Sequence, residues 1–293
     1  MFLWPVLSPD GNRVALTISQ YALGLNNELW SYDLERGTLS RITYSNDVWS
    51  PLWTADGDRL IYGTPQGIRS INSTGVGQIE ELSNITEVTQ FAPMPTSISP
   101  DGQQLLFTNY ALDQGNVQDI HTLNLTPEHQ FAPLINSEFT ENGAVISPDG
   151  RWVAYLSNET GRNELYVRPY PEIETGKWQI STDAGAWPMW SSSGKELFYR
   201  NHWVEGDTQT LVVAIESEPE FSAGTPQLLF TSDHKNNWGA YAVSDDAQRL
   251  LMLKPVVSRT LDQVAIPTNV VLVDNFDEEL KRLVPADPLQ DNF

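Results

Sequence analysis

Histidines and a recurring set of aspartates are the residues of this sequence that could do chemistry. The four histidines are suited to proton transfer or metal binding, but they are scattered along the chain at His121, His129, His202 and His234. A ring-shaped fold could bring His202 and His234 to one rim, yet two loop histidines are far more often solvated polar residues. We therefore expect no metal site and no cofactor.

Catalytic signatures are absent from the sequence. It contains no Gly-x-Ser-x-Gly elbow, no His-Glu-x-x-His pair, no phosphate-binding Walker loop and no dinucleotide fingerprint. We assign no catalytic residue, and we expect the chain not to be an enzyme.

The aspartates recur at one position of a repeated phrase, and they could form a ring of carboxylates. The phrase is Ser-Pro-Asp-Gly or a close variant, in which Pro sets a turn, Asp accepts backbone amide hydrogens and Gly takes a left-handed conformation. Ser193 replaces Asp in the fifth copy, so a carboxylate ring is disfavoured. We interpret these residues as structural turns: Asp10, Gly11, Asp56, Gly57, Asp101, Gly102, Asp149 and Gly150.

The spacing of the phrase indicates the fold. Its six copies begin at residues 8, 54, 99, 147, 191 and 244, which are 46, 45, 48, 44 and 53 residues apart. Apolar strand-like segments precede and follow each copy, and two more come before the next. Six units of four strands predict an all-β, six-bladed β-propeller with four antiparallel strands per blade. A sandwich or two small barrels would not predict one turn at a constant period.

We expect a single propeller over residues 1–285 and a tail over 286–293. The predicted blades cover approximately 1–45, 46–85, 86–138, 139–183, 184–233 and 234–285. Because the sequence starts directly on an inner strand, we expect the natural chain to continue upstream. Unless upstream residues supply a further strand, we expect the ring to close by face packing between the first and last blades.

The repeat resembles the bacterial TolB-like propeller, which is similar to the WD repeat without its Gly-His and Trp-Asp pairing. Segments such as "NETGRNELYVRPYPEIETGKWQIST" and "PTNVVLVDNFDEELKRLVP" further resemble one subgroup. In that subgroup the propeller is the extracytoplasmic C-terminal part of bacterial serine/threonine kinases, and similar propellers occur in membrane-anchored winged-helix regulators. The resemblance implies a periplasmic or otherwise extracytoplasmic location and a signalling role.

Composition limits the partners. The 17 Lys and Arg against 38 Asp and Glu give a net charge of −21, which repels phosphate backbones, so we expect no nucleic-acid partner. No apolar stretch is long enough to cross a bilayer, so we expect no membrane insertion by this segment. The chain has no cysteine, which excludes disulfides and thiolate metal sites.

The face opposite the repeated turns is the candidate functional surface, because variable loops on a rigid scaffold usually carry recognition. An aromatic precedes nearly every predicted inner strand, and these could either wedge blades together or line a mouth over the central channel. The candidate ligand- or partner-binding residues on this face are Tyr21, Tyr110, Trp203, Trp238, Trp187, Arg162 and His234.

Two functions remain open from the sequence. The first is a non-catalytic binding or sensor domain that recognises a protein or peptide through the channel-mouth face. The second is a periplasmic carbohydrate-binding protein, or a hydrolase or lyase, with a saccharide in the mouth. Converging carboxylates or histidines would favour the second, and an aromatic rim would favour the first.

Overall fold

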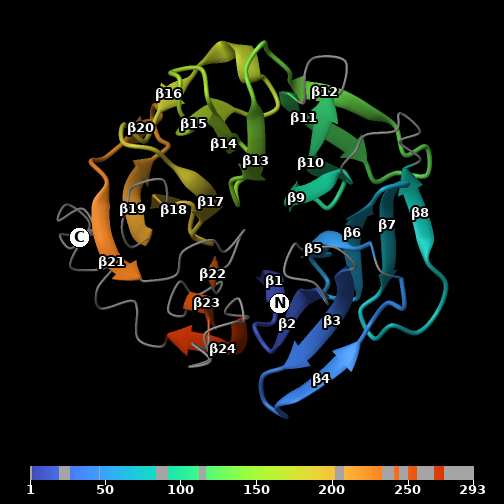
Figure 1. Cartoon of the computed structure of the whole chain (residues 1–293). Helices are drawn as coiled ribbons and strands as arrows, with labels where there is room; N and C mark the ends of the chain where they lie inside the picture. Colours follow the sequence, from blue (N-terminus) through green and yellow to red (C-terminus); the bar gives the residue numbers. More distant parts are fainter. Residues whose placement is uncertain are drawn as a thin grey trace, which may run out of the picture.

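A ring of antiparallel β-sheets forms the molecule (Figure 1). The structure, a computed structural model, describes residues 2–19, 27–45, 47–83, 92–111, 117–201, 208–232, 241–243, 250–255 and 267–273. In these ranges the strands form six sheets that follow one another in chain order. The first strand of each sheet lies nearest the centre of the ring (Figure 1). The chain is therefore an all-β propeller.

Each of the first four blades is a sheet of four consecutive strands. The first two blades comprise β1 (Phe2–Leu7), β2 (Arg13–Ser19), β3 (Asn27–Asp33), β4 (Thr38–Arg41), β5 (Trp49–Trp53), β6 (Arg59–Thr64), β7 (Gly67–Asn72) and β8 (Glu80–Ser83). The next two comprise β9 (Met94–Ile98), β10 (Gln104–Ala111), β11 (Val117–Asn124), β12 (Phe131–Ile135), β13 (Glu141–Ile146), β14 (Trp152–Ser157), β15 (Glu164–Pro169) and β16 (Trp178–Gln179). Between β15 and β16 the chain makes one 3-10 turn, η2 (Ile173–Thr175).

The fifth sheet departs from the four-strand expectation, and the sixth has three described strands. The fifth blade has β17 (Ala186–Trp190), β18 (Glu196–Asn201), β19 (Thr208–Glu216), β20 (Ser222–Ala223) and β21 (Gln227–Ser232). Its outer edge is divided, because β20 pairs with the end of β19 and β21 pairs with its beginning. The sixth sheet has β22 (Tyr241–Val243), β23 (Leu250–Pro255) and β24 (Pro267–Val273). The fourth strand predicted for it, at 279–284, lies outside the described residues.

The core consists of apolar layers between neighbouring blades, because each blade of the ring packs against another blade on both of its faces. Strand β2 shows the consequence, since three consecutive residues, Val14, Ala15 and Leu16, are all buried although alternate side chains point to opposite faces. Ala15 packs with Leu60 of the second blade. A strand buried on both faces therefore needs a continuous apolar run, and such a run comes after each turn phrase.

Face packing joins the first blade to the sixth sheet, as predicted. Strand β1 contacts β22 and β23. Val14 and Leu16 of the first blade form one buried cluster with Leu251 of β23.

Candidate functional site

The repeated turns lie together on one end of the propeller, here called the turn face (residues 8–11, 54–57, 99–102, 147–150 and 191–194). In the first turn, Asp10 Oδ1 accepts hydrogen bonds from Ser8 Oγ at 2.5 Å and from the Asn12 amide at 3.1 Å. Asp56, Asp101 and Asp149 accept the equivalent pair of bonds in their own turns. The carboxylates are thus used within their loops.

These hydrogen bonds favour the ionised aspartates. The hydroxyl of Ser8, Thr54 or Ser99 lowers the pKa of Asp10, Asp56 and Asp101, respectively, and the backbone amide two residues on adds to the effect. Burial opposes this at Asp149, but hydrogen bonds from Ser147 and Arg151 outweigh it, so that its pKa is lowered too. Each aspartate therefore stabilises its own turn.

The fifth turn keeps the same geometry by a different route. Ser193 stands at the aspartate position, and its hydroxyl accepts the Lys195 amide at 3.2 Å. The carboxylate comes instead from Glu196, which accepts hydrogen bonds from Ser191 Oγ and from Ser193 Oγ. All five described turn glycines have the predicted left-handed conformation: Gly11 (φ 68°), Gly57 (72°), Gly102 (70°), Gly150 (72°) and Gly194 (70°).

Adjacent turns also contact one another around the ring. The Cβ position of Gly57 lies 3.7 Å from the side chain of Pro9, that of Gly150 lies 3.7 Å from Pro100, and that of Gly194 lies 3.7 Å from Pro148. The exception is Gly102, which has nothing within 4 Å, because the preceding turn has Ala55 instead of proline. Each proline therefore packs on the glycine of the next turn.

The other end of the propeller, here called the entry face, is where the inner strands begin. Most inner strands carry a β-bulge there, in which two residues oppose one residue of the second strand. The first bulged residue has positive φ in four blades: Trp4 (45°), Ser50 (46°), Gly143 (64°) and Trp187 (55°). A bulky residue in this conformation is strained, so the bulge holds two tryptophans in orientations that a regular strand would not allow.

The bulges correct one expectation about the entry aromatics. Trp4, Trp49 and Trp187 lie within β1, β5 and β17, not in loops before them. Their side chains are half-buried, and the rings of Trp4 and Trp49 are 5.3 Å apart across the first two blades. Trp187 packs against two buried clusters, one between the fourth blade and the fifth and one between the fifth blade and the sixth sheet. These three aromatics therefore contribute to packing between blades, and each keeps part of its surface exposed. Phe139, in contrast, does precede its strand.

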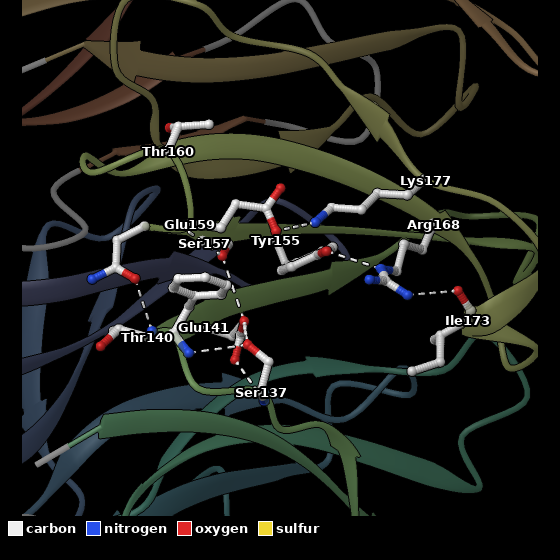
Figure 2. Close-up of polar contacts among 12 residues, drawn as sticks. Ser137, Thr140, Glu141, Tyr155, Ser157, Glu159, Thr160, Arg168, Ile173 and Lys177 are labelled. Carbon is white, nitrogen blue, oxygen red and sulfur yellow. Dashed lines mark hydrogen bonds and ion pairs between the residues drawn. The ribbon is translucent and has the colours of Figure 1, made fainter. Parts of the chain in front are cut away.

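Polar side chains gather at the entry end of the fourth blade (Figure 2). Glu141, only 3% exposed, accepts hydrogen bonds from Ser137 Oγ at 2.5 Å and from Ser157 Oγ at 3.4 Å. Ser157 lies between Glu141 and Glu164 in the sheet register, so two buried carboxylates occupy one row of the blade.

Arg162, a predicted partner-binding residue, is engaged inside this region. Its Nε donates to Glu164 Oε1 at 2.7 Å, and its Nη1 lies 3.3 Å from Asp183. Glu164 is 1% exposed and also accepts from Ser181 Oγ, so the guanidinium compensates a buried charge. The side chain of Arg162 remains half-exposed at the entry face.

Tyr110 is the third predicted partner-binding residue that the structure describes. It is half-buried near the entry end of β10 and pairs across the sheet with Gln118, whose Oε1 accepts from Asn142 Nδ2 of the fourth blade at 2.5 Å. Burial raises its pKa. Tyr21, Trp203, Trp238 and His234 lie outside the described residues, so only Tyr110, Trp187 and Arg162 are placed, each in a different blade.

Sequence reasoning missed Arg200, which is 3% exposed at the entry end of β18. The equivalent positions in the other blades, by pairing with the inner strand, are Thr17, Gly63, Thr108 and Leu156. The available signal was a charged residue in "ELFYRN", where the other repeats have small or apolar residues.

Metal sites and membrane spans have no candidate in the described part of the chain. No group of three or more His, Cys, Asp or Glu side chains is placed to hold a metal ion there. No helix in the same ranges has the length and apolar character of a membrane span.

Comparison with known proteins supports the fold. No protein-family model and no curated protein matches the sequence. TolB from Acinetobacter baumannii has a similar structure, with a TM-score of 0.65 and 19% identity over 83% of this chain and 58% of that one. A putative TolB from Agrobacterium tumefaciens gives 0.62 and 19% identity over 81% of this chain and 85% of that one.

Enzymes share the architecture as well. An oligogalacturonate lyase from Vibrio parahaemolyticus gives a TM-score of 0.62 at 8% identity, over 94% of this chain and 75% of that one. Identities this low show the fold alone. The expected likeness to TolB is confirmed as a likeness of structure, and this chain spans just over half the length of the Acinetobacter protein.

Proposed function

We propose that the chain is a non-catalytic binding or sensor domain that recognises a protein or peptide through its entry face. The observation that carries the proposal is the placement of Trp4, Trp49 and Trp187 at the entry ends of inner strands, two of them held in strained conformations. Strain of this kind concentrates at functional sites. Half-buried aromatics provide large contact area at a small cost in side-chain entropy.

The turn face supports the proposal by contrast. Its polar groups are bonded within each turn, and its glycines and prolines pack on one another, which leaves little variety for recognition. The finer assignments belong to the same proposal: a six-bladed, TolB-like ring whose last blade is completed by residues 279–284, in an extracytoplasmic protein of the kinase-associated subgroup.

Peptide selection on the immobilised chain tests this function. Peptides displayed on phage are selected, synthesised and titrated by fluorescence polarisation against the wild type and the Tyr110→Ala/Trp203→Ala double variant. We expect binding at least tenfold weaker in the double variant with an unchanged melting temperature. The matched control is Phe131→Ala, which removes an exposed aromatic from the outer strand β12. Equal affinities for wild type and double variant would show that the entry face is not the binding surface.

A carbohydrate-directed function is the second candidate, and one observation favours it. Glu141 and Glu164 are buried carboxylates on β13 and β15, the two strands that flank β14 in one blade, and paired carboxylates are the usual machinery of glycoside hydrolysis. Both are already hydrogen-bonded within the blade, which favours the binding function. Cleavage of an oligosaccharide by the wild type but not by Glu141→Gln would reverse this preference.

A further inference from the structure

Arg200 lies in an unusual place for a charged residue. Its guanidinium carbon is 5.8 Å from the ring centroid of Tyr241, the first residue of β22. Phe198, two residues earlier on the same side of β18, packs in one buried cluster with Tyr241. Arg200 is therefore enclosed between the fifth blade and the sixth sheet, one residue from the entry end of its strand.

The guanidinium has no acceptor among the described residues. Its Nε is fully enclosed without a hydrogen-bond partner, and no described carboxylate forms an ion pair with the guanidinium. The other described arginines differ, because each has a carboxylate, hydroxyl or carbonyl oxygen within reach. A buried charge without a partner is costly, so a counter-anion is expected at this position.

The neighbouring groups that the structure describes do not supply that anion. The Tyr241 hydroxyl donates to the Trp187 carbonyl oxygen at 2.5 Å. Burial lowers the pKa of Arg200, but a guanidinium stays charged at physiological pH. The ring of Tyr241 offers a cation–π contact, which compensates only a fraction of the lost hydration.

Equivalent positions at the other junctions are satisfied locally. Thr17 Oγ1 donates to the Leu3 carbonyl, and Thr108 Oγ1 accepts the Gly143 amide at 3.2 Å. At Gly63, a Cβ atom would lie 1.8 Å from the Pro93 carbonyl oxygen, so that junction has no room for a side chain. Among the five blades in which this strand position is described, only the fifth has a cation there.

We infer that Arg200 binds a carboxylate of a peptide ligand at the entry face, beside Trp187. The inference rests on the proposed function and names the chemistry of its ligand. The planar guanidinium matches a carboxylate with two parallel hydrogen bonds. Because the chain carries a net charge of −21, a ligand with one carboxylate among neutral or basic groups suits the site better than a polyanion.

Thermal unfolding tests whether Arg200 requires an anion. The full chain is melted at pH 7 in sodium acetate and in sodium chloride of equal ionic strength. We expect acetate to raise the melting temperature of the wild type and of Arg36→Met, a control on an exposed arginine, but not of Arg200→Met. Arg200→Met in chloride should be at least as stable as the wild type, since it removes an unpaired buried charge.

Two other outcomes would overturn the inference. An equal effect of acetate on wild type and Arg200→Met would place the anion elsewhere. A large loss of stability in Arg200→Met, with no acetate effect on the wild type, would show that the guanidinium is satisfied inside the protein. Arg200→Lys keeps the positive charge but lacks the paired N–H donors of a guanidinium, so acetate should raise its melting temperature only slightly.

Model ligands identify the source of the carboxylate. N-acetylglycine represents a peptide C-terminus and N-acetylaspartic acid amide represents an acidic side chain, each compared with its uncharged amide by NMR titration. The inference requires one of the two acids to bind at least tenfold more tightly than its amide, with the difference lost in Arg200→Met. If neither does, the inference is wrong. Selected peptides whose binding depends on Tyr110 but not on Arg200 would leave the proposed function standing and refute only this ligand chemistry.

Discussion

At the turn face, successive blades repeat the same kind of hydrogen bond, whereas at the entry face equivalent strand positions carry different residues. An aspartate, or Glu196 in its place, accepts a serine or threonine hydroxyl in all five described turns. On the other face, one strand position is Gly63 in the second blade and Arg200 in the fifth. The repeated chemistry builds the scaffold, and the divergent positions are where a specific function can reside.

Gly63→Ala, at the entry face, should cause the largest loss of stability. The new Cβ would lie 1.8 Å from a backbone oxygen of the third blade, so the two blades must separate. We expect a loss of about 3 kcal/mol or more in the free energy of unfolding, measured by urea denaturation. Gly224→Ala is the control, because its Cβ would make only an ordinary 3.5 Å contact with Ala214. Equal stability of both variants would contradict the tight junction.

Gly150→Val and Gly102→Val sharpen the comparison at the turn face. Both place a β-branched residue at positive φ, but only position 150 also faces a proline of the preceding turn. We expect Gly150→Val to lose about 1–2 kcal/mol of stability and Gly102→Val to lose less. Chemical denaturation of the two variants in parallel gives the difference, and a larger loss at Gly102 would argue against the contact.

Ala55→Pro should restore the missing contact. The first, third and fourth turns have proline at this position, and the new ring would reach the glycine of the third turn. We expect a gain of about 0.4–1 kcal/mol, chiefly because proline restricts the unfolded chain. The gain is read from the denaturation midpoint, with Ala55→Ser as a neutral control. A loss of stability would mean that the second turn differs from the others.

The smallest effect is expected from a single turn aspartate. The pKa of Asp101 is lowered in the folded chain by Ser99 and the Gln103 amide, so its stabilising effect is present above its unfolded pKa of about 3.9. That effect disappears as the pH falls from about 4 through the folded pKa. Asp101→Asn should lower the melting temperature at pH 7 slightly, because the neutral amide accepts the same hydrogen bonds more weakly, and it should make the decline below pH 4 shallower. An unaltered acid limb would show that the hydrogen bonds do not favour the charged form.

Much of the fold could be predicted from the repeat alone. The turn phrase and the apolar run after it predict β2, β6, β10, β14 and β18, because one signal is specific for a tight turn and the other for burial on both faces. The divided outer edge of the fifth blade was not predictable, since β20 is two residues long and has no pattern of its own.

Less of the candidate site than of the fold could be predicted from the sequence. The bulges depend on backbone conformation at Trp4, Ser50 and Trp187, where the residue types give no hint of positive φ. Arg162 was visible as a rare positive charge, but its pairing with Glu164 needed the strands to be placed. Arg200 resembled an ordinary strand residue, because burial between blades is a property of the assembled ring.

The contacts between prolines and glycines on neighbouring turns have a consequence for how such a ring evolves. The fourth blade takes part in two such contacts, through Gly150 and Pro148, so a copy of it at another position would bring a glycine suited to its former neighbour's proline. Substitutions should therefore be correlated between positions nearly fifty residues apart, and in one direction only: loss of a proline relaxes selection on the glycine of the following repeat. Ala55 and Gly102 are such a pair, because the second turn has no proline and the glycine of the third turn has no proline ring to pack on.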